Sequence, residues 1–262
     1  MLDSAARMAE FPHLRNAPIT EAVIDFRVEP DSAITVEELI QSLASRNNLG
    51  YVQKGVLVRS EFGFSLKIEA EPQVAHGGRA TTIGVRLHSP DDKYVAQLSV
   101  EGFTLSRLEP YETWENLVGE ARKVWAGYLE CLGPGHMTRI ATRYINNLRL
   151  PFSSPPEQFL KLLPVLPPGL PDALSEFLQR YVLHDATSQA TVIVMEALER
   201  TVPTKPLPVI LDIDAFRSVR IPTNDSHVWE YLTQLRDLKN RIFYGCLTPA
   251  GVELYQHDRL DA

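Results

Sequence analysis

Apolar residues alternate with polar residues in several short stretches of this chain. The first stretch runs from Ile19 to Val28 and is followed by Pro30. Period-two patterns of this kind, rich in β-branched residues and bounded by proline or glycine, are typical of strands that bury one face. The pattern recurs at 61–69, 81–88, 94–108, 137–150, 187–198 and 209–219. We expect each stretch to be a strand, and 94–108 is long enough to bend at Gly102.

Two longer stretches, 114–132 and 227–247, carry apolar residues at the helical period. Thr113 is a candidate N-cap of the first, and Gly133 is expected to end it. Ser226 is expected to cap the second. The chain therefore predicts two long amphipathic helices, each placed after a strand.

Two shorter helices are also expected. At 35–46, Thr35 and Glu38 have the spacing of a capping box, in which each side chain bonds the backbone of the other. Asp172 can cap another helix at 173–182. Strands and helices are thus mixed along the chain, which predicts an α+β fold.

The two long helices match each other at a constant offset. Trp114-Glu115-x-Leu117 recurs as Trp229-Glu230-x-Leu232, and Cys131-Leu132 recurs as Cys246-Leu247. The chain has three tryptophans, so a chance match of this kind is improbable, and we infer an internal duplication. Both cysteines lie at helix ends beside leucine, which predicts buried free thiols.

Each half then reads strand, helix, antiparallel strands and long helix. We expect two similar α+β halves, 1–135 and 136–262, packed as one pseudo-symmetric globule. Their element order is similar to that of helix-grip and TBP-like folds, an analogy that implies no function. Prolines are dense at 151–172, which predicts a connector with a short helix.

Composition narrows the classes of function. The chain has 26 Lys+Arg against 33 Asp+Glu, a formal net charge of −7. An acidic protein repels phosphate backbones, so nucleic acid is not expected as a partner. The sequence also lacks GxSxG, GxxxxGK[ST] and GxGxxG motifs, and no two histidines lie at zinc-ligand spacing. We therefore expect no cofactor and no metal, and a non-catalytic protein is favoured over an enzyme.

The first residues, MLDSAARMAEF, contain no apolar run long enough for a signal peptide. No window of the chain approaches the uninterrupted apolar length of a transmembrane helix. We therefore expect a cytoplasmic protein that does not enter a membrane.

The stretch 138–150 (TRIATRYINNLRL) is the strongest candidate for a site. In a strand its alternate side chains share a face, and one face carries three guanidinium groups and an amide. Such a face can bind a carboxylate, a phosphate or an acidic protein partner, because arginine presents a bidentate fork. The alternative is a structural face whose arginines pair with internal carboxylates. The candidate residues are Arg139, Arg143, Asn147 and Arg149, with Tyr144 and Asn146 as supports on the reverse face.

The first strand supplies partners for these arginines, since Glu21, Asp25 and Arg27 share one of its faces. If the two halves pair through their first strands, Glu21 and Asp25 can neutralise Arg139 or Arg143, and structural pairing is the favoured interpretation.

Other polar residues give weaker signals. Asp212 and Asp214 share a strand face and could hold a metal with other oxygen ligands, but a solvated face is favoured. Asn240 lies near the boundary of the apolar face of the last helix. We expect its side chain to hydrogen-bond a neighbouring backbone group rather than a ligand.

Five segments together resemble a sporadically distributed family of uncharacterised bacterial proteins. They are 16–23 (NAPITEAV), 110–115 (PYETWE), 138–146 (TRIATRYIN), 211–214 (LDID) and 238–243 (LKNRIF). The resemblance spans most of the chain but brings no catalytic residue or cofactor with it. What it implies is an accessory role, such as one in a defence or toxin–antitoxin locus.

We therefore expect a non-catalytic binding or protein-interaction module, with an unidentified protein or an acidic small ligand as its partner; a homo-oligomer is also compatible. The alternative is a small-ligand protein or enzyme that uses a cavity between the sheet and a long helix. A deep pocket with converging Arg, Asn and Tyr side chains and a perturbed carboxylate would favour that alternative. An exposed strand edge would favour interaction.

Overall fold

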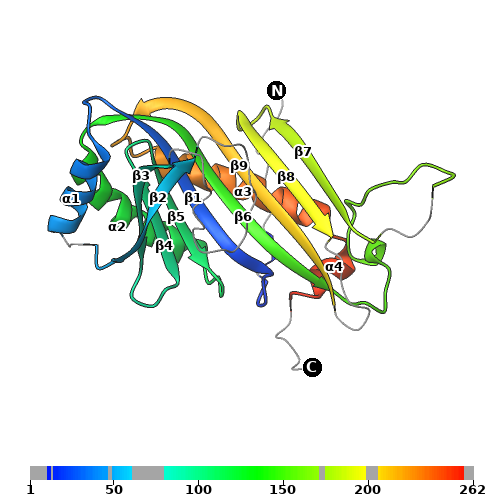
Figure 1. Ribbon diagram of the computed structural model, residues 1–262. Coiled ribbons are helices and arrows are strands. Elements are labelled where there is room, and N and C mark those ends of the chain that lie inside the picture. Colours follow the sequence, from blue (N-terminus) through cyan, green and yellow to red (C-terminus); the bar gives the residue numbers. More distant parts are fainter. Residues whose placement is uncertain are drawn as a thin grey trace.

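The computed structural model describes residues 11–12, 14–46, 49–60, 80–170, 175–198 and 206–256. Within them, nine strands form one sheet in the order β2-β3-β4-β5-β1-β6-β9-β8-β7, and each neighbouring pair is antiparallel (Figure 1). The strands are β1 (Ile19–Pro30), β2 (Val52–Ser60), β3 (Ala80–His88), β4 (Tyr94–Ser99), β5 (Gly102–Leu108), β6 (Gly135–Leu150), β7 (Phe177–Asp185), β8 (Ala190–Leu198) and β9 (Leu207–Pro222).

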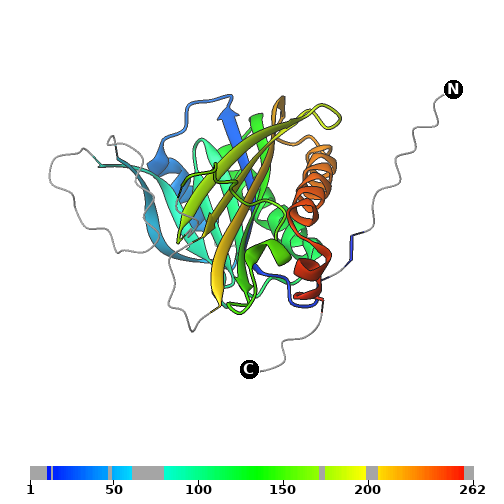
Figure 2. The same ribbon diagram turned by 90° about the vertical axis from the view of Figure 1, so that its right-hand side faces the viewer.

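Two long helices, α2 (Trp114–Leu132) and α3 (Val228–Cys246), cover the same face of this sheet (Figures 1 and 2). The side chain of Phe26 on β1 shows this directly, because its ring contacts both Trp125 of α2 and Trp229 of α3, at centroid distances of 4.8 and 6.0 Å. We call this the covered face and the opposite one the open face. The shorter elements are α1 (Val36–Arg46) beside α2, the 3-10 turn η1 (Pro156–Gln158) and α4 (Pro249–Glu253).

The expected architecture of two helix-grip halves is wrong. The described residues form a single sheet, with 44% of them in strands and 27% in helices. The reason lies in β1, whose two edges pair with β5 and β6, so that the hydrogen-bonding groups of both edges are satisfied within one sheet. The boundary expected near residue 135 is the start of β6, which is paired with β1 over most of its length.

Several local predictions are confirmed. The capping box of α1 forms, since Glu38 N donates to Thr35 Oγ1 at 3.2 Å and Thr35 N donates to Glu38 Oε2 at 2.8 Å. Thr113 Oγ1 caps α2, and the helix ends at Gly133, whose φ of 82° favours glycine. Both cysteines are buried and free.

Other local predictions are wrong. Part of the helix expected at 173–182 is strand β7, which pairs with β8 from Phe177↔Leu198 to Asp185↔Ala190. The strand expected at 94–108 is a hairpin of β4 and β5, closed at the pair Ser99↔Gly102.

The start of α3 also differs from the expectation. Its N-cap is His227 rather than Ser226, and the side chain of Asp225 accepts from the backbone nitrogen of His227 at 2.9 Å. The strand expected at 61–69 and the cap expected at Asp172 lie outside the described residues. Among the described helices, none combines the length and apolar character needed to cross a membrane.

Candidate functional site

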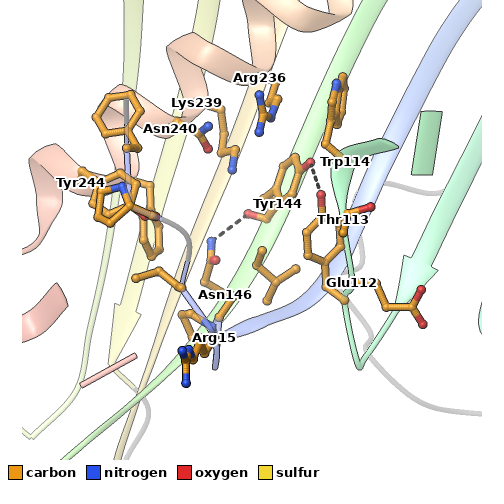
Figure 3. Close-up of a pocket in the computed structure, with 18 of the residues that line it drawn as sticks. Arg15, Glu112, Thr113, Trp114, Tyr144, Asn146, Arg236, Lys239, Asn240 and Tyr244 are labelled. Carbon is orange, nitrogen blue, oxygen red and sulfur yellow. Dashed lines mark hydrogen bonds between the residues drawn. The ribbon is translucent and has the colours of Figure 1, made fainter. Parts of the chain in front are cut away.

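A cavity of about 220 Å³ lies on the covered face, where α3 crosses β6 beside the start of α2 (Figure 3). Four parts of the fold build its walls: β6 forms the floor, α3 passes over it, and residues of the segments 11–19 and 111–115 close the sides. The polar and charged residues that line it include Arg15, Tyr111, Glu112, Glu115, Tyr144, Asn146, Arg236, Lys239 and Asn240.

Lys239 is unusual among the side chains of this cavity because it is a buried lysine. It lies on the apolar stripe of α3, four residues after Leu235 and four before Phe243, so the helix directs it toward the sheet. Only 7% of the residue is exposed. Its Nζ lies 3.7 Å from the centroid of the Tyr144 ring, and it makes no hydrogen bond or ion pair within the described part of the chain. Figure 3 shows it reaching from α3 toward Tyr144 and Asn146.

The surroundings of Lys239 disfavour its charged form. Burial lowers the pKa of its amine to about 7, and the positive charge of Arg236, one helical turn earlier, acts in the same direction. Asp237 opposes this shift, and the negative face of the Tyr144 ring attracts an ammonium group as well. Burial is the largest of the causes that set this pKa, so the neutral amine is accessible near pH 7.

Two tyrosines extend the polar part of the cavity. The hydroxyls of Tyr111 and Tyr144 are 3.2 Å apart, and their rings meet edge to face. Burial raises the pKa of both groups, so each hydroxyl keeps its proton at neutral pH. Asn146 Nδ2 donates to the carbonyls of Leu211 at 2.8 Å and Tyr144 at 3.3 Å, which fixes the amide at the floor.

The acidic residues of the rim do not neutralise Lys239. Glu112 accepts from Arg107 Nη2 at 2.8 Å and from Asn116 at 2.9 Å, so its carboxylate is already used. Glu115 is exposed on the first turn of α2. Arg236 is 3.6 Å from Asp237 and lies over the Trp114 ring, with 5.8 Å between the guanidinium carbon and the ring centroid. The cavity therefore holds a buried amine beside a guanidinium group.

The candidate arginines lie on the open face, across the sheet from this cavity. Arg139 donates to Asp25 at 2.7 Å and to Asp214 at 2.8 Å, and its guanidinium carbon is 4.5 Å from the centroid of the Phe216 ring. Asp25 also accepts from Thr104 at 2.7 Å and pairs with Arg27 at 3.3 Å. The expected partnership between the first strand and Arg139 therefore exists.

The other members of the arginine stretch differ from Arg139. Arg143 donates twice to Asp212, at 2.8 and 2.5 Å, and its side chain is 44% exposed. The hydrogen bond with Asp212 raises the pKa of Arg143 further. Arg149 is exposed, and Asn147 is half-buried with no hydrogen-bond partner on its Oδ1 within the described residues. Glu21 lines the same face as Arg143.

Asp212 and Asp214 were expected to lie on a solvated face, and they serve instead as partners of Arg143 and Arg139. Burial raises the pKa of Asp214, while the two arginines oppose that shift. No cluster of three or more His, Cys, Asp or Glu suited to a metal occurs within the described ranges.

The structure thus divides the predicted site residues between two faces. Tyr144, Asn146 and Asn240 meet in the cavity, whereas the arginines and their partners lie on the open face. Sequence reasoning missed Lys239 and Tyr111. The available signal for Lys239 was a lysine within the apolar stripe of the last helix. No family model matches the chain, and no curated protein matches it, so the roles assigned here rest on this geometry.

Proposed function

We propose that this protein binds a small acidic molecule in the cavity between β6 and α3. The observation that carries the proposal is Lys239, a buried amine that faces a cavity and has no carboxylate partner within the described residues. A carboxylate ligand would supply that partner and would favour the ammonium form. Converging Tyr, Asn and Arg side chains around such a group are typical of ligand sites.

The size and charge of the cavity limit the ligand. A volume of about 220 Å³ is below the usual range of roughly 300–1,000 Å³ for sites that hold drug-sized molecules, which favours a ligand of few atoms. Lys239 and Arg236 lie one helical turn apart and can contact one acid group together. We also keep the cytoplasm as the proposed location of the protein.

Thermal unfolding in the presence of acetate, propionate or benzoate tests this proposal. At fixed ionic strength and pH 6.5, we expect the Tm to rise with acid concentration, because ligands that bind the folded state stabilise it. Lys239→Met should abolish the rise, and Arg149→Ala on the open face should keep it. An equal response of all three proteins, or no response of the unmodified chain, would contradict the proposal.

A second candidate function is the protein-interaction module, and strand β7 is the observation that favours it. β7 is an outermost strand of the described sheet, and its Leu178 is 68% exposed. Tyr181, Val182 and Leu183 are exposed on the same strand. An unpaired edge with apolar side chains can add a strand from another chain.

The oligomeric state tests this second function with a second copy of the chain as the partner. If two β7 edges pair, light scattering should give the mass of a dimer, and Val182→Pro should yield a monomer because proline removes a backbone donor. Val56→Pro on β2, at the other edge of the described sheet, is the matched control. A monomer at all concentrations would contradict this pairing.

A further inference from the structure

The environment of Lys239 suits a nucleophilic amine better than a permanent ion pair. Its Nζ lies over an aromatic ring, inside a cavity, and no carboxylate of the described chain holds it as an ammonium group. Arg236, one helical turn earlier, adds a second positive charge, which further favours the neutral amine. Lysines that form imines are activated in this way, by desolvation or by a neighbouring cation.

We propose that the acidic ligand of this cavity carries an aldehyde or ketone carbonyl, and that Nζ of Lys239 condenses with that carbonyl to form an imine. This inference rests on the proposed function, since it names the ligand class of the same site. It adds a covalent step that ion pairing alone does not require.

The step balances without any other reactant. The lone pair of the neutral Nζ attacks the carbonyl carbon, a C–N bond forms, and the carbonyl oxygen takes up a proton to give a carbinolamine. Loss of the hydroxyl group as water then leaves a C=N bond, and both hydrogens of that water account for the two protons that the amine gives up. Hydrolysis reverses the step, so the ligand is released unchanged.

Different neighbours of Lys239 can hold the acid group and the carbonyl group of such a ligand. The planar guanidinium fork of Arg236 can hold the acid group, whereas Lys239 can lose its proton and react. The hydroxyl pair of Tyr111 and Tyr144 lines the same cavity, and the one proton that is not used between the two hydroxyls can be donated to the carbonyl oxygen. An arginine in place of Lys239 would still attract an acid but could not add to a carbonyl.

Reductive trapping with pyruvate tests the inference. Pyruvate is a small acid with a ketone, and lactate is the matched acid without one. The full chain is incubated at pH 7 with each acid and with cyanoborohydride, which reduces an imine to a stable secondary amine. We expect intact mass spectrometry to show one pyruvate adduct per chain, peptide mapping to place it on Lys239, and lactate to give none.

Variants separate this inference from the proposed function. Lys239→Arg and Lys239→Met should lower the adduct at least about tenfold, because neither side chain offers a neutral amine at pH 7. Lys123→Met, which removes an exposed lysine of α2, should leave it unchanged. If acetate stabilises the chain through Lys239 but pyruvate gives no adduct there, the imine is refuted and acid binding stands. If neither acid binds, both are refuted.

Discussion

The two faces of β6 treat positive charge in opposite ways. On the open face, Arg139 lies between Asp25 and Asp214, and Arg143 is bonded to Asp212. On the covered face, Lys239 lies over a side chain of the same strand with no carboxylate partner within the described residues. Strand β6 therefore separates two faces. On the open face carboxylates of the chain neutralise the arginines, and on the covered face the amine of Lys239 has no such partner within the described residues.

We interpret this difference as one between charged groups that stabilise the fold and a charged group that is kept for binding. On the open face, Asp25 and Asp214 already offset the charge of Arg139. Removing Arg139 should therefore lower the stability of the folded chain. Lys239 imposes an energetic cost on the folded chain, since its ammonium form is disfavoured by burial. A residue that destabilises the folded chain is a candidate for a role in binding or catalysis.

The largest expected effect is that of Arg139→Ala. The substitution leaves Asp25 and Asp214 without their shared cation, and the side chain of Arg139 is only 25% exposed. We expect the free energy of unfolding to fall by about 2–4 kcal/mol, slightly less than for a fully buried pair. Urea unfolding followed by tryptophan fluorescence at pH 7 measures it.

Arg139→Ala combined with Asp25→Asn and Asp214→Asn is the control for that mutation. The triple variant removes the stranded charges, so it should recover part of the lost stability. A single variant as stable as the unmodified chain would show that the open face is not held together by this ion pair.

Lys239→Met should have an effect of similar size and the opposite sign. The folded state lowers the pKa of Lys239 to about 7, so between pH 7 and the ordinary lysine value the unfolded chain binds more protons. The stability of the unmodified chain through this group therefore rises with pH in that window. We expect the variant to be more stable by about 2–4 kcal/mol at pH 7, with the gain shrinking toward pH 10.

Chemical unfolding of both proteins at several pH values from 7 to 10 measures this difference, and the exposed Lys123→Met is the matched control. A gain that stays constant with pH would contradict a neutral Lys239, because only a proton bound differently by the two states gives a pH slope.

Smaller effects are expected for Arg143→Ala and, last, for Arg149→Ala. The Arg143 side chain is 44% exposed, so water can enter the space that it leaves and reach Asp212, whose own side chain is only 8% exposed. We expect a loss of about 1–2 kcal/mol, and less than about 0.5 kcal/mol for the exposed Arg149→Ala. Denaturant unfolding of the two variants side by side checks this order, and the reverse order would overturn the assignment of Arg143 as a paired residue.

Features that depend on neighbours along the chain could be predicted from the sequence. The capping box at Thr35 and the termination of a helix at Gly133 are set by short-range geometry, and both exist. Alternation along β6 correctly separated Arg139 from Tyr144, because successive side chains of a strand point to opposite faces.

Features set by distant contacts were not predicted. Alternation identifies the faces of β1 but not the strands at its edges, so one merged sheet could not be distinguished from two. The stretch that became β7 was interpreted as a helix because its short apolar pattern fits either period. Lys239 was overlooked for a related reason: a lysine on an apolar stripe is noticed only if its burial is suspected, and burial depends on β6.

The central position of β1 has a consequence for how the chain folds during synthesis. Its partner at one edge, β6, begins only after the stretch from Asp31 to Pro134 has been made, which takes on the order of 10 s at roughly 5–20 residues per second. Until then β1 can pair with β5 alone, and the edge meant for β6 stays open to other strands. We therefore expect a nascent chain arrested before β6 to be the form most prone to aggregate.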